Sequence, residues 1–166
     1  EKAQYDLHEN NPDDTGYRRF LGRLTDPLLE KLSPGSVGLD FGCGPGPTLS
    51  VMLEEVGHRV ALFDPIYHPN PKVLERQYDF ITATEVFEHL HHPQRDLERL
   101  WSCLGSRGWL GVMTKRAQNL EAFSTWHYIQ DPTHVGFWSG NTFSWLAGYW
   151  GAQLELIDPD VALFRK

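Results

Sequence analysis

The sequence predicts an α/β fold built on one mainly parallel sheet of about six strands. Short apolar segments alternate with segments whose apolar residues recur at helical spacing. A glycine-rich turn joins the first of these apolar segments to a helix, as in units of two parallel strands and a crossover helix. The 166 residues have the length of one domain, so we expect residues 1–166 to share a single core.

The first elements are a polar arm and a long helix. Residues 1–16 contain the turn-forming run NNPDD, and we expect them to form an arm before the helix. The apolar residues of positions 15–31 fall at helical spacing. Pro27 lies inside this stretch and is predicted to kink or split the helix, which the run SPG at residues 33–35 ends.

The next elements form a strand–turn–helix–strand unit. Residues 37–41 predict a strand, the turn GCGPG follows at residues 42–46, and residues 47–56 predict a helix. Residues 59–63 predict the second strand, with Asp64 at its carboxyl end. Such a unit implies parallel strands whose carboxyl ends lie at the same edge of the sheet.

The rest of the chain supplies the other strands of the sheet. Residues 65–77 hold three prolines and are too short for a helix plus a strand, so a strand there is missing or vestigial. The remaining predictions are strands at 78–84 and 109–114, helices at 93–104 and 141–150, and an antiparallel hairpin of residues 153–157 and 161–165 at the sheet edge.

Composition excludes several classes of protein. The chain has 15 basic and 22 acidic residues and a net charge of −7, which argues against nucleic-acid binding through general charge. No apolar run approaches the roughly 20 residues that a membrane span needs. Cys43 and Cys103 are too few for a disulfide framework, which favours a cytoplasmic protein. We expect a monomer or a homodimer. Because the chain begins at Glu1 rather than Met, we expect a further segment upstream.

The glycine-rich turn indicates a nucleotide-type ligand. Gly42 and Gly44 allow positive φ and close approach of the backbone to a ligand at the start of a helix. A dinucleotide site prefers G-x-G-x-x-G/A, but its last position is Pro47 here, and Asp40 would repel a pyrophosphate. An NAD-dependent dehydrogenase is therefore less favoured. A tight turn flanked by two surface aspartates, with no ligand, is the remaining alternative.

A ligand with a positive amine fits these residues better. S-adenosylmethionine carries an amine, a sulfonium cation and no phosphate, and Asp40 can attract its amine. Asp64 lies 18 residues after Gly46 and can accept hydrogen bonds from both ribose hydroxyls. Arg18 can pair with the donor's carboxylate, or it can lie on the solvated first turn of the helix. The residues that we expect to contact this donor are Arg18, Asp40, Gly42, Cys43, Gly44, Asp64, Pro65 and Glu85.

Several stretches resemble class I S-adenosylmethionine-dependent methyltransferases. They are VGLDFGCGPGP at residues 37–47, Asp64, and YDFITATEVFEHL at residues 78–90. YDLHENNPDDTGYRRF at residues 5–20 and WHYIQDPTHVGFW at residues 126–138 resemble a bacterial subgroup of these methyltransferase domains. The resemblance implies a Rossmann-like sheet, S-adenosylmethionine as cofactor, and transfer of its methyl group to an acceptor.

The chain departs from this family pattern after the second strand. In most relatives the next helix and strand lead to a polar residue that holds the adenine, and residues 65–77 leave no room for them. We therefore expect Pro65, Ile66 and Tyr67 to supply an apolar wall for the adenine instead.

The residues after the strand at 78–84 are candidates for acceptor chemistry. Glu85 can contact the donor's methionine part or the acceptor, or it can simply stabilise the start of a helix through the dipole. His89 is a candidate general base, with a surface histidine as the alternative. His89, His91 and His92 with the nearby glutamates match no standard spacing of metal ligands, so no metal is expected.

The aromatic segment at residues 115–140 is expected to form a lid over the acceptor. Nine of the 21 aromatic residues lie between Phe123 and Trp150. The resemblance places His134 over the acceptor pocket, where Asp131 can orient it as a general base; alternatively it is a core histidine of a structured loop. The residues expected to bind the acceptor are Trp126, Tyr128, His134 and Phe137.

These predictions favour a methyltransferase that acts on a small-molecule acceptor. An S-adenosylmethionine-binding or regulatory protein without catalysis is the main alternative, and the dehydrogenase is the least favoured.

Overall fold

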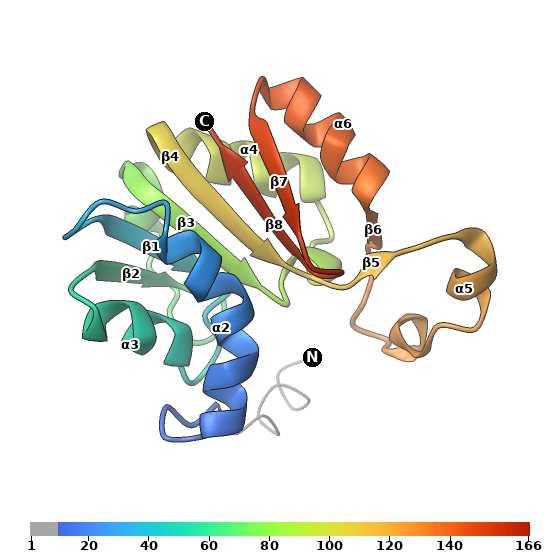
Figure 1. Cartoon of the computed structure of the whole chain (residues 1–166), viewed down its shortest axis with the longest axis horizontal. Coiled ribbons are helices and arrows are strands. Elements are labelled where there is room, and N and C mark those ends of the chain that lie inside the picture. Colours follow the sequence, from blue (N-terminus) through green and yellow to red (C-terminus); the bar gives the residue numbers. More distant parts are fainter. Residues whose placement is uncertain (1–9) are drawn as a thin grey trace.

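A computed structural model describes residues 10–166 of the chain (Figure 1). A six-stranded sheet lies at the centre of these residues, in the order β2–β1–β3–β4–β8–β7. Its strands are β1 (Val37–Phe41), β2 (Arg59–Phe63), β3 (Tyr78–Thr84), β4 (Leu104–Met113), β7 (Gln153–Ile157) and β8 (Val161–Arg165). The first four strands in this order run parallel, whereas β8 is antiparallel to β4 and β7 is antiparallel to β8. The predicted parallel sheet with an antiparallel C-terminal hairpin is confirmed.

Helices cover both faces of the sheet (Figure 1). Leucines of α2 (Thr15–Leu29) and α3 (Thr48–Glu55) pack with Phe80 in one hydrophobic cluster. Apolar residues of α4 (Pro93–Cys103) and α6 (Gly140–Trp150) pack with Ile81 in a second cluster. Because successive side chains of a strand point to opposite faces, these two neighbouring residues of β3 divide the core into two layers.

Two predicted boundaries differ from the structure. Helix α2 continues through Pro27 and ends at Leu29, so the proline does not split it. Strand β4 begins at Leu104, where α4 ends, rather than at residue 109. The stretch GSRG in its first half lacks the β-branched and aromatic residues typical of strands, and Arg107 there has a φ of +67°.

The connection between β2 and β3 contains no full strand. Asp64 and His68 form an isolated antiparallel bridge, and the 3₁₀ helix η1 (Pro71–Glu75) follows. Strand β2 is therefore an outer strand of the sheet. This agrees with the prediction that a third strand is missing or vestigial at residues 65–77.

The segment between β4 and α6 leaves the sheet and returns to it (Figure 1). Its base is the parallel pair of β5 (Arg116–Ala117) and β6 (Trp138–Ser139). Between them lie α5 (Leu120–Ser124) and the 3₁₀ helix η3 (His127–Gln130). The amides of Val135 and Gly136 donate to the carbonyl oxygen of Glu88 at 2.8 and 3.0 Å, which fixes the returning segment just before β6 against the loop after β3.

The aromatic residues of α6 divide into packed and exposed ones. Trp150 stacks on Trp101 of α4 with ring centroids 4.4 Å apart. Trp145 and Tyr149 stack on each other but are 67% and 58% exposed. Among the helices of residues 10–166, none is both long and apolar enough to cross a bilayer.

Candidate active site

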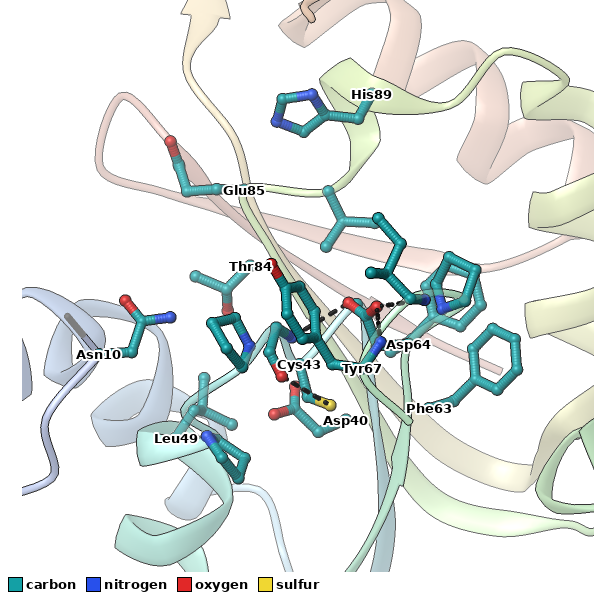
Figure 2. A pocket seen from close by; sticks show the side chains of 18 of the residues that line it. Asn10, Asp40, Cys43, Leu49, Phe63, Asp64, Tyr67, Thr84, Glu85 and His89 are labelled. Atoms are coloured by element: carbon teal, nitrogen blue, oxygen red, sulfur yellow. Dashed lines mark hydrogen bonds between the residues drawn. The ribbon is translucent and has the colours of Figure 1, made fainter. Parts of the chain in front are cut away.

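A cavity of about 1100 Å³ lies at the carboxyl ends of β1, β2 and β3. Its walls come from the glycine-rich turn, the connection after β2, the loop after β3, the first turns of α4, and the turn at residues 131–134. Figure 2 shows Asp40, Cys43 and Asp64 together, with Glu85 and His89 toward the other end. In open α/β sheets, this edge is where ligands bind.

The glycine-rich turn requires glycine for geometric reasons. Gly42 has a φ of +74°, and a Cβ there would lie 2.4 Å from the side chain of Val86. Its amide donates to the carbonyl oxygen of Phe63 at 2.7 Å, and the amide of Gly44 donates to Asp64 Oδ2 at 3.1 Å. The turn is thus tied to the end of β2, which places both aspartates beside one cavity.

Asn10 closes over this turn. A Cβ on Gly46 would lie 2.4 Å from the carbonyl oxygen of Asn10, and Thr48 Oγ1 donates to the same oxygen at 3.0 Å. Asn10 therefore lines the cavity, as does Tyr17, where burial raises the pKa to about 12. Sequence reasoning missed Asn10 because its backbone carbonyl is held by a side-chain hydroxyl, that of Thr48, 38 residues away. Residues 1–9 of the expected arm lie outside the described part of the chain.

Asp40 is a buried carboxylate without a cationic partner in residues 10–166. It is 4% exposed and accepts hydrogen bonds from Thr82 Oγ1 at 2.8 Å and Ser50 Oγ at 3.0 Å. None of the ion pairs within these residues includes it. Burial raises the pKa of Asp40 to about 6. Such a group favours a positively charged ligand, so it fits the amine of S-adenosylmethionine.

Asp64 is held by backbone amides. Oδ2 accepts from Gly44, and Oδ1 accepts from Ile66 at 2.8 Å and Tyr67 at 3.0 Å. A carboxylate has about four acceptor positions, so roughly one remains for a ligand hydroxyl. The sequence-based expectation of two ribose hydroxyls therefore requires one backbone amide to give way, whereas one hydroxyl fits as it stands.

The wall beyond Asp64 is mainly apolar. Pro65, Ile66 and Tyr67 all line the cavity, in the place expected for an adenine, and Leu74 of η1 joins them. Helix α4 adds Arg95, Asp96 and Arg99, which sequence reasoning did not identify. Arg99 follows Asp96 by three residues and Arg95 by four, so its side chain neighbours both of theirs on α4, a signal that the sequence contained.

Arg18 and Cys43 were both expected at the donor, and the structure places only Cys43 in the cavity lining. Arg18 does not belong to the cavity lining; its guanidinium pairs with Glu55 and donates to the carbonyl oxygen of Pro12 at 3.2 Å. Arg18 lies on a face of α2 that meets α3, so its guanidinium forms an ion pair with Glu55 at the end of α3. Cys43 does line the cavity, but burial raises the pKa of its thiol, which therefore stays protonated.

Glu85 lines the cavity between the two aspartates and the end that contains His89. Its φ is +52°, and its amide donates to the carbonyl oxygen of Met113 at 2.7 Å. Backbone strain of this kind is typical of functional sites. Burial, and then the charge of Glu88, raise the pKa of Glu85 well above its ordinary value, which lets the protonated carboxyl donate a hydrogen bond.

Glu88, His89 and His134 meet at the far end of the cavity and line it. Glu88 and His89 lie in the 3₁₀ helix η2 (Phe87–His89), and His134 comes from the returning part of the aromatic segment. The rings of the two histidines are 4.9 Å apart, edge to face. His134 Nε2 also lies 3.8 Å from Asp131 Oδ2.

Three aromatic residues expected to bind the acceptor pack against one another instead. The ring of Trp126 lies 4.8 Å from that of Tyr128 and 6.2 Å from that of Phe137. Tyr128 is 5% exposed, and its hydroxyl donates to Glu88. None of the three belongs to the cavity lining found among residues 10–166, to which the segment contributes Asp131, Thr133 and His134. The aromatic cluster thus supports the turn that carries His134.

Comparisons with known proteins agree with this geometry. Residues 14–158 match a family described as a methyltransferase domain. No curated protein sequence matches the chain significantly.

Solved structures share the fold at low sequence identity. A S-adenosylmethionine-dependent methyltransferase from Archaeoglobus fulgidus is 17% identical, with a TM-score of 0.63 over 90% of this chain and 94% of that one. A protein from Methanococcus maripaludis is 11% identical, with a TM-score of 0.66 over 100% and 93%. Magnesium protoporphyrin IX methyltransferase from Synechocystis is 13% identical, with a TM-score of 0.58 over 90% and 82%. Since the family match covers most of the chain and the fold agrees, the protein belongs to the methyltransferase-domain family, as a class I S-adenosylmethionine-dependent methyltransferase.

Proposed function

We propose that the protein methylates a small-molecule acceptor bound beside Glu85, His89 and His134. One observation supports this most: a single cavity contains both the two aspartates at the glycine-rich turn and the two imidazoles at its far end. Donor and acceptor can therefore lie in contact, and holding two reactants in contact supplies much of the rate of a displacement reaction.

The donor end fits S-adenosylmethionine, which supplies an electrophilic methyl group when bound. Asp40 attracts the amine because, among residues 10–166, its buried carboxylate accepts side-chain hydrogen bonds from hydroxyls alone. Asp64 accepts a ribose hydroxyl, and Pro65, Ile66 and Leu74 give the adenine an apolar surface. Arg18, which the sequence also suggested, is directed to Glu55.

The acceptor end presents two oriented imidazoles. His134 Nδ1 lies 2.7 Å from the carbonyl oxygen of Tyr128, and His89 Nδ1 lies 3.0 Å from that of Thr133. A carbonyl only accepts hydrogen bonds, so Nδ1 carries the hydrogen in both rings, and in a neutral imidazole Nε2 then carries the lone pair. These lone pairs can receive a proton or bind a positive group as the acceptor reacts.

The nature of the acceptor follows from size and charge. The cavity of about 1100 Å³ must hold the donor as well, which leaves space for a small molecule. The net charge of −7 disfavours a nucleic acid. A reducing, cytoplasmic setting is part of this proposal, because Cys43 and Cys103 are both unpaired.

Two measurements test the proposal. Calorimetry should show binding of S-adenosylmethionine but not of NAD. Incubation with a methyl-labelled donor and the small-molecule fraction of a cell extract should move the label to a new compound, and His134→Ala should reduce this transfer while donor binding persists.

The outcomes separate the alternative functions. Donor binding without transfer to any extract would indicate a regulatory or donor-binding protein and contradict catalysis. Binding of NAD in place of the donor would overturn the proposal entirely. Unchanged transfer in His134→Ala would remove that residue from the acceptor site.

A further inference from the structure

The far end of the cavity combines two imidazoles with a buried carboxylate from segments far apart in the sequence. We propose that Glu88, His89 and His134 bind one divalent transition-metal ion of the Zn²⁺ type. No metal was expected from the sequence, since the histidines beside Glu88 lack standard spacing. In the structure, the histidine that lies beside Glu88 and His89 is neither His91 nor His92. It is His134, which belongs to another loop.

The positions of the candidate ligand atoms are close to those of a metal site. One nitrogen of each histidine and one carboxylate oxygen of Glu88 all lie within 4.8 Å of one another. Zinc binds such atoms at about 2.0–2.2 Å, so two ligands of one ion lie at most about 4 Å apart. A small closure of the three side chains around an ion therefore completes the site.

The histidines are oriented as metal ligands usually are. Metal-bound histidines almost always donate their other ring N–H to a carbonyl or carboxylate, which fixes the ring and its tautomer. The Nδ1 atoms of His134 and His89 face the carbonyl oxygens of Tyr128 and Thr133 at 2.7 and 3.0 Å. Nε2 is then the ligand atom in both rings.

The buried charge of Glu88 provides an independent observation. Glu88 is 0% exposed, and its two oxygens accept hydrogen bonds from the hydroxyls of Thr114, at 2.8 Å, and Tyr128. No ion pair formed within residues 10–166 includes it. Buried carboxylates are normally paired with a cation or bound to a metal. Asp131, 3.8 Å from His134 Nε2, adds negative charge beside the same site.

The ligand set selects the class of metal. Imidazole suits Zn²⁺, Fe²⁺ and Co²⁺, whereas Mg²⁺ and Ca²⁺ prefer oxygen ligands throughout. Two histidines and one carboxylate also leave coordination positions open. These positions would face the cavity and take an oxygen, nitrogen or sulfur atom of an acceptor. That last step rests on the proposed methyltransferase function, whereas metal binding itself does not.

Cobalt provides a direct probe of the site. The protein, freed of any histidine tag and treated with chelator, is titrated with Co²⁺ in the absence of S-adenosylmethionine. We expect one equivalent to bind with a visible absorption band from nitrogen and oxygen ligands, and Zn²⁺ to remove that band by displacement. Zn²⁺ should also raise the melting temperature of the wild-type protein, because it binds only the folded state.

Variants assign the ligands. His89→Ala, His134→Ala and Glu88→Gln should each abolish the cobalt band or weaken binding more than about 100-fold, which exceeds the loss typical of residues around a site. His92→Ala is the matched control, since this exposed histidine makes no side-chain cap at the start of α4. Circular dichroism checks that each variant is folded, and if His134→Ala is not, the other two decide.

The outcomes are distinct from those for methyl transfer. Absence of saturable cobalt binding, or equal binding by all variants, overturns the metal site. If such a protein still binds S-adenosylmethionine and loses methyl transfer in His134→Ala, the methyltransferase function stands and the imidazole acts directly. Cobalt binding in a protein that binds no donor would instead support the metal site while contradicting the proposed function.

Discussion

Asp40 and Glu88 occupy opposite ends of one cavity and are held in the same manner. Each is a buried carboxylate whose oxygens accept hydrogen bonds from two hydroxyls, Ser50 and Thr82 at one end, Thr114 and Tyr128 at the other. Neither forms an ion pair within residues 10–166. Two buried negative groups without cations indicate two places for positively charged ligands.

The two ends differ in how they are assembled. The donor end is built on one strand–helix–strand unit, in which the turn at Gly44 and Asp64 at the end of β2 are 20 residues apart. The acceptor end joins Glu88 to Tyr128, 40 residues away, through a segment that leaves the sheet. A local unit can therefore form the proposed donor site from few residues, whereas the proposed acceptor end depends on how a long segment outside the sheet packs.

The largest expected effect lies at the donor end. Asp64→Ala should weaken S-adenosylmethionine binding by about 100-fold or more, because a charge-assisted hydrogen bond worth roughly 1.5–3 kcal/mol is lost while three backbone amides lose their acceptor. Calorimetry measures the change. Asp79→Ala is the control, since that carboxylate also accepts from a backbone amide, Val37, but at the opposite edge of the sheet. Equal losses in both variants would contradict a specific role for Asp64.

Asp40→Asn should weaken donor binding and at the same time stabilise the fold. We expect roughly 10- to 100-fold weaker donor binding at pH 7.5, because the charge that attracts the amine is lost. In the wild-type protein, donor affinity should also fall as the pH decreases through about 6, where Asp40 becomes protonated.

The same substitution should stabilise the fold at neutral pH. Burial raises the pKa of Asp40 from 3.8 to about 6, so the folded state holds its proton more tightly and loses stability as the pH rises between these values. Removing the charge should therefore add on the order of 2–3 kcal/mol at pH 7.5 and almost nothing at pH 4. Urea denaturation at both pH values measures this, and a stability gain independent of pH would contradict the explanation.

At the acceptor end, Tyr128→Phe removes one of the two hydroxyls that hold Glu88. The free energy of unfolding should fall by about 1–2 kcal/mol, since a buried acceptor loses its donor. Metal binding should weaken about tenfold, while donor affinity stays unchanged. Tyr149→Phe is the matched control, because Tyr149 is exposed and its hydroxyl donates a long hydrogen bond of 3.4 Å to the exposed Glu98. A loss of donor affinity in Tyr128→Phe would show that the two ends are not independent.

The smallest effect is expected for Arg18→Ala. The sequence suggested a bond from Arg18 to the donor's carboxylate, whereas the structure pairs it with Glu55 outside the cavity lining. We therefore expect donor affinity within about twofold of the wild type and a slight drop in melting temperature, as for other exposed ion pairs. Glu55→Ala, which breaks the same ion pair, should lower the melting temperature by the same amount as Arg18→Ala. A tenfold loss of donor affinity in Arg18→Ala alone would restore the sequence-based role.

The sequence by itself determined the sheet, the glycine-rich turn and the place of Asp40 and Asp64. Strand and helix periodicity, turn residues and the ends of strands are local properties, so they can be read from short stretches of chain. The missing third strand followed from the prolines of residues 65–77 in the same way. These local signals also identified the methyl donor.

Only the tertiary structure decided which residues meet across the cavity. Tyr128 was expected to touch the acceptor but holds Glu88, and Glu88, His89 and His134 were not expected to form one group. Their meeting depends on backbone hydrogen bonds from Val135 and Gly136 to Glu88 and on the packing of the aromatic cluster. Contacts between distant segments depend on how both segments pack against each other. The pattern of apolar residues within either segment alone does not predict them.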